Sequence, residues 1–461
     1  MDVRESDVDR RDLRVETGGA LARALTLVGL NATAFYHDAA AALRSARSLL
    51  PARRRIRTSS RPSRGFAELA GYSAILKHRK VAERFNFSDP FYRCHEESVG
   101  SQIYIDGRAY LNFSSYDYLG LNRHPAVAQA AKAAIDRHGT TVSASRIVSG
   151  ERALHRQLES ALADFYETEC ALTFVSGHAT NVSTIAALME PEDLVIHDEL
   201  CHNSILVGAK LSGATVRPFR HNDMAALERL LSEERGCYRN ALIVVEGLYS
   251  MDGDIPDLPG LIELKQRHGA WLMVDEAHAL GVLGKHGRGV AEHFDIDPRE
   301  VDVWMGTLSK ALSACGGYIA GSHELIEVLK FRAAGQVYSV GMSPPLAAAA
   351  LAALQQLKAE PERVARLQAN GALFLKEARA RGLDTVTSEG YAIVPVMVGD
   401  IVRAGRITDR MLARGVNVLP IIYPAVPLKA ARLRFFLTSE HTPEQIRSVV
   451  QITAEELDKL A

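Results

Sequence analysis

From about residue 65 onward, the chain alternates short apolar runs with longer stretches that repeat every three to four residues. Short runs rich in β-branched residues are typical of strands buried on both faces of a parallel sheet, and the longer repeat is typical of helices packed on one side. The pattern therefore predicts an α/β fold with a mostly parallel central sheet flanked by helices. Strands are expected at Ala171–Val175, Leu194–His197, Ala241–Val245, Trp271–Val274 and Val303–Met305. Helices are expected at Leu154–Tyr166, Ala225–Glu234 and Leu258–His268.

Composition narrows the class of protein without identifying it. Of the 461 residues, 47% are hydrophobic and 24% are charged, and the net charge of -1 gives no general attraction to nucleic acid or to an anionic membrane. No apolar run reaches the roughly 18–20 residues of a membrane-spanning helix. The five cysteines are scattered without any CxxC spacing, so neither a disulfide scaffold nor a metal site is expected, and the reducing cytoplasm is the expected location.

The first 64 residues differ from the rest of the chain. They contain 13 Arg, no Lys and 7 acidic residues, and they end in an Arg- and Ser-rich segment with the composition of a linker. Acidic residues near the start, beginning with Asp2 and Glu5, argue against a transit peptide. Two interpretations stay open: a poorly ordered extension with one or two helices between about Leu21 and Leu49, or an arm that docks an acidic partner.

Charged residues follow two consecutive predicted strands. One strand runs directly into Asp275, and the other runs through a Gly-Thr-Leu-Ser turn to Lys310. A carboxylate at the end of a buried strand needs a cationic partner, because burying it unpaired is costly. Pyridoxal phosphate (PLP) chemistry uses both groups: a lysine that binds the cofactor covalently, and an acid that keeps the pyridine nitrogen protonated. Either residue alone is more often structural, but the two at consecutive strand ends favour such a site.

Three further segments give weaker signals. Ser176–Asn181 (SGHATN) follows a predicted strand and opens a helix, where free backbone N–H groups bind phosphate. His202 follows the next strand; an imidazole there would lie flat on a pyridine ring, although a lone histidine is usually an ordinary buried polar residue. Val245–Asp254 (VEGLYSMDGD) is a strand that ends in a polar turn. None of the three identifies a function by itself.

Together these segments resemble those of the α-oxoamine synthases, a family of fold type I PLP enzymes. The family includes serine palmitoyltransferase, 8-amino-7-oxononanoate synthase, 5-aminolevulinate synthase and 2-amino-3-ketobutyrate ligase. The resemblance covers Leu111–Thr442, about three quarters of the chain, and keeps the family's order. It rests on Asn112–Gly120 (NFSSYDYLG), Ser145–Gly150 (SRIVSG), SGHATN, EGLYSMDGD, VDEAHALGVLG, GTLSK and Arg432–Arg434 (RLR).

The resemblance also implies how the chain is organised. It implies an N-terminal extension (residues 1–64), an N-terminal segment (residues 65–115), a large PLP-binding domain (residues 116–340) and a smaller α+β C-terminal domain (residues 341–461). Fold type I enzymes usually build the site across a dimer, so a C2 homodimer is expected. The Ala-rich stretch Leu346–Leu354 is expected to be a buried or dimer-facing helix.

The resemblance implies a role for each residue around the cofactor ring. Lys310 would be the Schiff-base lysine, and Asp275 would be the partner of the pyridinium nitrogen. His278, with Ser250 nearby, would contact the ring hydroxyl. His202 would stack on the ring face and help to orient the amino-acid carboxylate.

Further residues would bind the cofactor phosphate and the substrate. The backbone at Gly177 and His178, together with Thr307, would hold the phosphate. Arg434 matches the arginine that clamps the substrate carboxylate, a task that suits its planar, forked guanidinium.

The implied reaction is a decarboxylative condensation of a small L-amino acid with an acyl thioester, giving an α-amino ketone, CO2 and a free thiol. Three positions bear on the substrate. Tyr116 stands where oxononanoate and aminolevulinate synthases carry Asn, and Ala425 replaces a substrate-contacting threonine of those two groups. Ser145 is smaller than the threonine of glycine-specific aminolevulinate synthases, which favours serine or alanine over glycine.

Tyr116 and Ala425 favour a serine palmitoyltransferase-like enzyme, and the Arg-rich extension, which could dock an acyl carrier protein, suits a polyketide-linked synthase. These two form the main expectation, with an 8-amino-7-oxononanoate synthase-type enzyme of biotin synthesis as the alternative. The acyl donor is either acyl-CoA or an acyl carrier protein. Two other classes remain open. An aminotransferase or racemase would share Lys310 but should lack the EGLYSMDGD and SRIVSG segments together, and a non-catalytic subunit of a heterodimeric synthase typically lacks the lysine.

Overall fold

The computed structural model describes residues 65–423 and 425–460, so the expectations for residues 1–64 lie outside the described residues. The chain divides into two units, Met1–Tyr72 and Ser73–Ala461. Of the first unit only residues 65–72 are described, with η1 (Phe66–Glu68) and the start of α3 (Ala70–Phe85). The fold and the site described below belong to the second unit.

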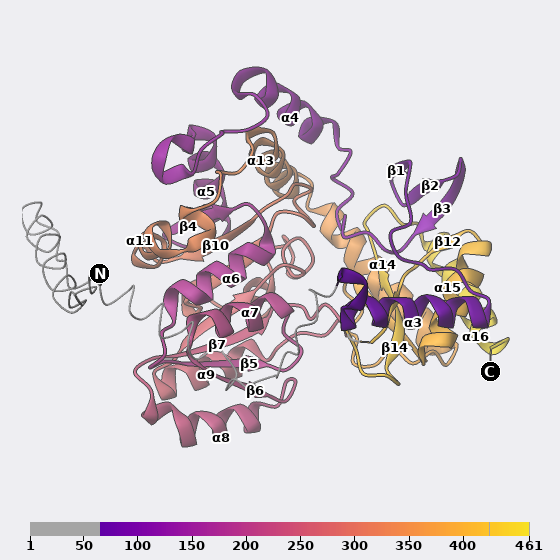
Figure 1. Cartoon of the computed structure of the whole chain (residues 1–461). Coiled ribbons are helices and arrows are strands. Elements are labelled where there is room, and N and C mark those ends of the chain that lie inside the picture. Colours follow the sequence, from indigo (N-terminus) through magenta and orange to yellow (C-terminus); the bar gives the residue numbers. More distant parts are fainter. Residues whose placement is uncertain (1–64, 424, 461) are drawn as a thin grey trace, which may run out of the picture. The chain divides into compact units, whose positions relative to one another are not determined.

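A seven-stranded sheet runs through the described part of this unit, in the order β4-β10-β9-β8-β7-β5-β6 (Figure 1). Neighbouring strands from β9 to β6 are parallel, and β10 is antiparallel to both of its neighbours. The predicted mostly parallel sheet is therefore confirmed. The strands are β4 (Cys170–Phe174), β5 (Leu194–Asp198), β6 (Thr215–Phe219), β7 (Ala241–Glu246), β8 (Trp271–Asp275), β9 (Val303–Thr307) and β10 (Gly317–Gly321).

All five predicted strands are present, each shifted or extended by one or two residues. The sequence pattern did not indicate β6 or β10. β6 contains Arg217 and Pro218 and lies at the edge of the sheet, where a proline costs no ladder hydrogen bond. β10 begins at Gly317 and ends at Gly321, and glycine is depleted in strands.

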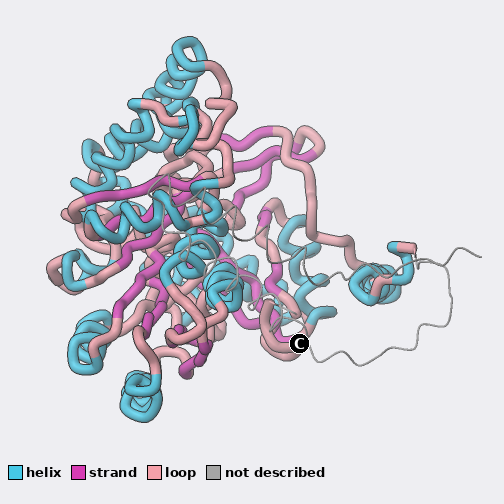
Figure 2. The backbone as a smooth tube through the Cα atoms, turned by 60° about the vertical axis from the view of Figure 1, so that its left-hand side comes forward, coloured by secondary structure: helices cyan, strands magenta, loops and turns pink. Residues whose placement is uncertain are grey.

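The sheet is buried on both faces. Along β7, Leu242 and Val244 belong to one hydrophobic cluster, whereas Ile243 and Val245 belong to the other. The alternation arises because successive side chains of a strand point to opposite faces. The first cluster also contains residues of helices α6 (Gly177–Leu188), α7 (Asn203–Ser212) and α11 (His323–Arg332). The second also contains residues of α5 (Ala153–Tyr166), α8 (Met224–Glu234), α9 (Leu258–His268) and α13 (Pro344–Ala359). Figure 2 shows the strands lying between the two sets of helices.

The three predicted helices correspond to α5, α8 and α9, each within one residue of its expected start. α13 contains the Ala-rich stretch; most of its alanines are buried, and it packs against α4 and α5. The helices of this region are α4 (Pro125–His138), α5 (Ala153–Tyr166), α6 (Gly177–Leu188), α7 (Asn203–Ser212), α8 (Met224–Glu234), η3 (Arg235–Cys237), α9 (Leu258–His268), α10 (Val290–His293), η4 (Pro298–Glu300), α11 (His323–Arg332), α12 (Ala334–Val337) and α13 (Pro344–Ala359).

Two smaller sheets complete the described fold, in the orders β1-β2-β3-β12 and β11-β14-β13. Because β12 pairs in parallel with β3, the N-terminal segment joins its sheet to the C-terminal part of the chain. The domain boundaries expected at residues 115 and 340 stay a proposal. The elements are β1 (Glu97–Val99), β2 (Gln102–Ile105), β3 (Arg108–Asn112), α14 (Glu362–Ala380), β11 (Ile393–Gly399), α15 (Ile401–Ala413), β12 (Val416–Asn417), β13 (Pro420–Ile421), β14 (Ala431–Phe436) and α16 (Pro443–Asp458).

Candidate active site

Polar residues end four neighbouring strands of the large sheet. The last residues of β5, β7, β8 and β9 are Asp198, Glu246, Asp275 and Thr307, and all four are buried. Because these strands are parallel, their carboxyl ends meet at one edge of the sheet, where ligands of open α/β sheets bind. A cavity of about 250 Å³ lies at this edge, and three of the four residues line it.

The cavity brings together all eight residues predicted to bind the cofactor. They follow five different strands, and the two that open α6 lie more than 130 residues before Lys310. Those eight residues are Gly177, His178, His202, Ser250, Asp275, His278, Thr307 and Lys310. The sequence analysis gave no individual role to the remaining residues that line the cavity, which are Ser176, Asn181, Ser204, Glu246, Ala277, Met305 and Ser309.

Lys310 is half-buried in the segment that follows β9. Burial lowers the pKa of its ammonium group to about 8, and the nearby carboxylates Asp275 and Glu246 oppose this shift. A lysine of this kind loses its proton far more readily than an ordinary lysine, as a nucleophile or a base must. Its Nζ lies 5.6 Å from the ring centre of Tyr116, so this predicted substrate-binding residue adjoins the reactive amine.

Asp275 is connected to His202 through two side chains. Nδ2 of Asn181 donates to Oδ2 of Asp275 (2.8 Å) and to Oγ of Ser204 (3.0 Å). The Ser204 hydroxyl donates in turn to Nδ1 of His202 (2.7 Å). Burial lowers the pKa of His202, and since its Nδ1 is an acceptor, the neutral ring carries its proton on Nε2. The network fixes both the position and the tautomer of His202.

Tyr118 orients His278. The Tyr118 hydroxyl lies 2.6 Å from Nδ1 of His278, and burial raises the pKa of the phenol well above its ordinary value, so the phenol keeps its proton and can donate it to Nδ1. Burial also lowers the pKa of His278 well below its ordinary value. With Nδ1 as the acceptor, the neutral ring carries its N–H at Nε2. The ring stacks on Phe436 with ring centres 6.3 Å apart.

The start of α6 and Thr307 together form a site that fits a phosphate group. Gly177 and His178 are the first residues of the helix, so their N–H groups have no acceptor within it. A Cβ atom on Gly177 would lie only 2.9 Å from Oγ1 of Thr307, which explains the glycine. The hydroxyls of Thr307 and Ser309 lie 2.8 Å apart on the same wall of the cavity. Helix-start amides and hydroxyls are the usual donors to a phosphate.

Arg434 lies next to the cavity rather than among the residues that line it. Its Nη1 donates to the carbonyl of Ser250 (2.8 Å), and its guanidinium group lies 4.7 Å from the ring centre of Phe436. Nε of Arg434 is buried without a hydrogen-bond partner among the described residues. A buried N–H without a partner suits the predicted contact with a substrate carboxylate.

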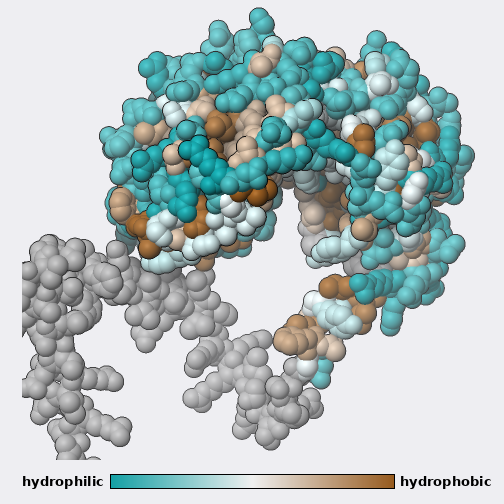
Figure 3. Space-filling view, turned by 90° about the horizontal axis from the view of Figure 1, so that it is seen from above, coloured by the Kyte–Doolittle hydropathy of each residue, from teal (hydrophilic) through white to brown (hydrophobic). Residues whose placement is uncertain are grey.

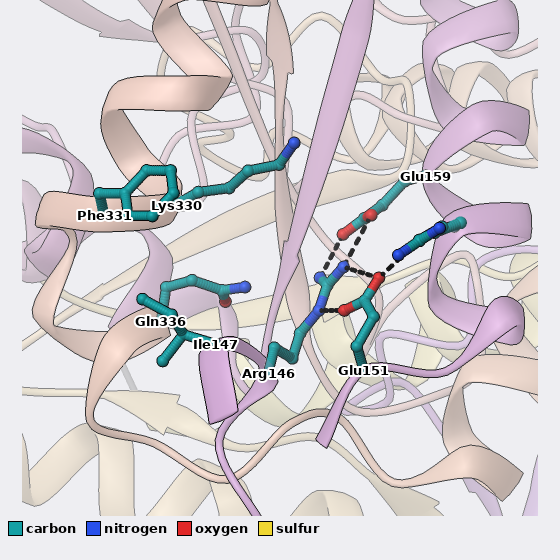
Figure 4. A pocket seen from close by; sticks show the side chains of 8 residues that line it. Arg146, Ile147, Glu151, Glu159, Lys330, Phe331 and Gln336 are labelled. Atoms are coloured by element: carbon teal, nitrogen blue, oxygen red, sulfur yellow. Dashed lines mark hydrogen bonds and ion pairs between the residues drawn. The ribbon is translucent and has the colours of Figure 1, made fainter. Parts of the chain in front are cut away.

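The structure does not place Ser145 in the cavity of its own chain. Ser145 precedes η2 (Arg146–Gly150), a π-helical turn beside a second cavity of about 420 Å³ (Figure 4). Arg146 lines this second cavity and is held between the carboxylates of Glu151 and Glu159. The predicted substrate role of Ser145 stays a prediction.

Glu246 is a titratable residue of the active-site cavity whose individual role the sequence analysis missed. It is the register partner of Asp275 on the neighbouring strand. Burial and the negative charge of Asp275 raise the pKa of Glu246 to about 8. Oε2 accepts the backbone N–H of Ser250 (3.1 Å), and Oε1 has no hydrogen-bond partner among the described residues. The signal in the sequence was its place at the end of an apolar strand, the same feature that singled out Asp275.

The described residues contain no group of three or more His, Cys, Asp or Glu side chains suited to a metal ion. None of the described helices is both long and apolar enough to cross a membrane.

Comparisons with known proteins match this fold. The family model described as aminotransferase class I and II matches residues 108–452. The 8-amino-7-oxononanoate synthase of Symbiobacterium thermophilum is 44% identical over 342 residues, which are 74% of this chain and 87% of that protein. The solved serine palmitoyltransferase of Sphingomonas wittichii gives a TM-score of 0.80 at 30% identity, covering 84% of this chain and 98% of the other. A solved structure of SPT with a PLP internal aldimine gives a TM-score of 0.81 at 29% identity. The match covers 86% of this chain and 99% of that chain.

These findings define a fold type I transferase of the aminotransferase class I and II family. Within that family, the chain belongs to the α-oxoamine synthases, which are PLP-dependent acyltransferases. The expected family, fold class, enzyme class and cofactor are thereby confirmed. The sequence relative carries the name of the alternative, 8-amino-7-oxononanoate synthase, so the comparisons support that alternative better than the serine palmitoyltransferase-like main expectation.

Proposed function

We propose that this chain is an 8-amino-7-oxononanoate synthase-type enzyme, which joins Cα of a small L-amino acid to the acyl carbon of a thioester. The bond between Cα and the carboxylate breaks, the acyl C–S bond breaks, and a bond forms between Cα and the acyl carbon. The proton first removed from Cα is replaced after CO2 leaves, and the thiolate takes a proton from solvent. The products are an α-amino ketone, CO2 and a free thiol.

The cavity at the carboxyl ends of β7, β8 and β9 carries the proposal. It combines Lys310, a half-buried lysine whose pKa is lowered to about 8, with a carboxylate on the neighbouring strand. It also contains two histidines, His202 and His278, whose Nδ1 atoms are each occupied by a hydroxyl. The start of α6 and Thr307 add a site that fits a phosphate group. This is the set of groups that PLP requires.

The chain's own residues supply binding and proton transfer. PLP, when bound, withdraws electrons from Cα of an amino acid attached to it. Lys310 would hold the cofactor, and its amine, when neutral, would serve as the base for the Cα proton. Asp275 would keep a proton on the ring nitrogen, and its carboxylate is held in place by the N–H groups of Asn181 (2.8 Å) and Ala277 (2.9 Å).

The remaining residues orient the reactants. His278 and the Ser250 hydroxyl would donate to the ring hydroxyl of the cofactor, and the ring of His202 would cover one face of the pyridine. Arg434 binds the amino-acid carboxylate through its planar guanidinium group. Because Arg434 also donates to the carbonyl of Ser250, the substrate and cofactor contacts are mechanically linked.

The relative's name gives the substrate class. In 8-amino-7-oxononanoate the amine-bearing end is CH3–CH(NH2)–, which is what remains of alanine after it loses CO2. The ketone and the rest of the chain then come from a seven-carbon acyl thioester that ends in a carboxylate. We therefore infer alanine as the amino acid and an ω-carboxyacyl thioester, bound to CoA or to a carrier protein, as the donor.

Serine with a long-chain acyl thioester is the second candidate. It is favoured by Tyr116 and Ala425, which replace the Asn and Thr of oxononanoate synthases, and by the similarity to solved serine palmitoyltransferases. The two candidates share all steps at Cα and differ only in the amino-acid side chain and in the acyl tail.

A homodimer is part of the proposal. Ile147 and Val148, at the tip of the η2 turn, have exposed fractions of 50% and 79% in the single chain. Figure 3 shows hydrophobic side chains between hydrophilic ones on one face of the molecule. A second copy of the chain would remove such apolar side chains from water.

The deciding experiment is a visible absorption spectrum of the purified protein, titrated separately with alanine, serine and glycine. We expect a coloured protein whose band shifts with alanine, and whose band is absent in Lys310→Ala. A protein that stays colourless after PLP is added would contradict the proposal and favour a non-catalytic subunit. Release of thiol from ω-carboxyacyl-CoA against palmitoyl-CoA then separates the two candidates.

A further inference from the structure

A histidine outside the cavity connects the two turns that carry His202 and Ser250. His221 follows β6 and lies between two buried carboxylates. Its Nδ1 lies 3.0 Å from Oδ1 of Asp198, the last residue of β5. Its Nε2 lies 2.9 Å from Oδ2 of Asp254, the last residue of the EGLYSMDGD segment after β7.

The arrangement requires the charged form of His221. Each ring nitrogen faces a carboxylate oxygen, and an ionised carboxylate only accepts hydrogen bonds, so both nitrogens must donate. Burial alone would lower the pKa of His221, but the hydrogen bonds to Asp198 and Asp254 raise it to about 10. The other titratable groups that face it are Glu199, whose Oε1 accepts the His221 backbone N–H (3.2 Å), and Tyr249, whose ring packs edge-on at 4.5 Å.

His221 thus bridges Asp198 and Asp254. On the Asp198 side, this bridge holds the turn that leads to His202. Oδ1 of Asp198 accepts the backbone N–H of Leu200 (2.8 Å), and its carbonyl accepts that of Cys201 (3.1 Å). These bonds shape the short turn between β5 and His202, which begins α7 as its N-cap. A displacement of Asp198 would therefore move the residue proposed to cover the cofactor ring.

On the Asp254 side, the bridge holds the turn that contains Ser250. The backbone N–H of Tyr249 donates to the carbonyl of Asp254 (2.9 Å), and that of Gly253 donates back to Tyr249 (2.9 Å). The hydroxyl of Thr387 donates to the same Asp254 oxygen that His221 binds (2.8 Å). Ser250 lies inside this closed turn, and its own N–H binds Glu246.

We propose that His221 is a positioning residue, an imidazolium that fixes the His202 turn and the Ser250 turn relative to each other. It lies outside the cavity and acts only through these two turns. β5 and β7 are neighbours in the sheet, but the segments beyond their ends leave the sheet, so the sheet ladder does not hold them together. A fixed cation between one carboxylate from each segment supplies that connection.

The test uses the PLP-loaded protein, and it rests on the proposed function for its spectroscopic signal. In His221→Gln only the amide nitrogen of the side chain can donate, so the variant can form a hydrogen bond to only one of the two carboxylates. We expect the visible circular dichroism of the bound cofactor to change sign or fall by at least half. We also expect kcat to fall at least tenfold while KM for the amino acid changes less than threefold. His286→Gln is the matched control, because His286 also pairs with a carboxylate, Glu292, at an exposed site away from the cavity.

A second variant protects the test against misfolding. Asp254→Asn keeps the shape of the turn and the Asp198–His221 pair, and should give the same spectroscopic change in weaker form. Wild-type visible circular dichroism and kcat in folded His221→Gln and Asp254→Asn would overturn the inference. A wild-type protein without a cofactor band would instead contradict the proposed function, so the two failures are distinguishable.

Discussion

The side-chain amide of Asn181 donates a hydrogen bond of 2.8 Å to Oδ2 of Asp275. The second amide hydrogen points to Ser204, so one side chain of α6 fixes both the strand-end carboxylate and the hydroxyl that orients His202. Asn181→Leu keeps the volume and removes both bonds. Since a hydrogen bond to a charged group contributes about 1.5–3 kcal/mol, we expect the dissociation constant for PLP to rise about tenfold or more. Fluorescence titration of the cofactor-free protein with PLP measures this.

The control for Asn181 lies at the opposite edge of the sheet. Asn240 also donates its side-chain amide to a carboxylate, Asp193, at 3.1 Å, but it precedes β7 rather than following a strand. Asn240→Leu should leave the affinity for PLP unchanged. Equal weakening by both variants would mean that loss of fold stability, rather than loss of the contact with Asp275, is the cause.

Two arginines of β14 separate substrate binding from stability. Arg434 donates to the Ser250 carbonyl and keeps a buried N–H without a partner among the described residues, whereas Arg432 forms a buried ion pair with Asp252. Arg434→Lys keeps the charge and loses the planar fork, so KM for the amino acid should rise at least tenfold with little change in Tm. Arg432→Met leaves Asp252 buried and unpaired and should cost about 3–5 kcal/mol in the free energy of unfolding.

Steady-state kinetics with alanine, together with thermal unfolding of both variants, checks this contrast. An unchanged KM in Arg434→Lys would remove Arg434 from the substrate site. An unchanged Tm in Arg432→Met would mean that the buried pair with Asp252 contributes no net stability.

Glu246 should make the cofactor-free protein less stable in mild alkali. Its pKa is raised in the folded state to about 8 from an ordinary 4.5. A group with a raised pKa in the folded state contributes stability that is complete below pH 4.5 and is lost as the pH rises through about 8. In Glu246→Gln the side chain stays neutral at every pH. The difference in Tm between the variant and the wild type should therefore be small at pH 5 and should favour the variant increasingly up to pH 9.

Thermal unfolding between pH 5 and pH 9 measures this difference. A difference in Tm that is constant across that range would show that Glu246 titrates in the folded state as it does in the unfolded chain. Because Asp275 is its register partner, Asp275→Asn should weaken the effect by removing the neighbouring negative charge.

The sequence predicted the parts of the fold and site that local pattern determines. Five buried strands were recognisable because apolar runs in a parallel sheet are nearly continuous. Asp275 was recognisable because it stands directly after such a run, and Lys310 because it follows the next run after a short Gly-Thr-Leu-Ser turn. Edge strand β6 was missed, since Arg217 and Pro218 interrupt its apolar pattern.

Contacts between distant segments could not be predicted from the pattern. The bridge from Asp198 through His221 to Asp254 joins three segments, and no spacing in the sequence indicates that they meet. The same holds for Tyr118 and His278, which are 160 residues apart. The shifted pKa of Glu246 depends on burial in the finished cavity, which the sequence does not specify.

The glycine that opens α6 gives the sharpest test of the phosphate site. A Cβ at Gly177 would lie 2.9 Å from Oγ1 and 3.1 Å from Cβ of Thr307, so either the helix start or Thr307 must move. Thr307 is held by the Gly316 carbonyl (3.0 Å) and by Ser309 (2.8 Å), which leaves it little freedom to adjust. We expect Gly177→Ala to raise the dissociation constant for PLP at least tenfold. Gly236→Ala is the control, because no heavy atom lies within 4 Å of the added Cβ.

Pyridoxal, which lacks the phosphate, shows where any loss in Gly177→Ala arises. If the helix start and Thr307 bind the phosphate, wild-type protein and Gly177→Ala should bind pyridoxal equally weakly, and the variant should lose affinity only for the phosphorylated cofactor. An equal loss for both ligands would place the damage at the pyridine ring instead. It would then contradict the assignment of Gly177, His178 and Thr307 to the phosphate, because an added methyl group at a phosphate site cannot weaken a ligand that has no phosphate.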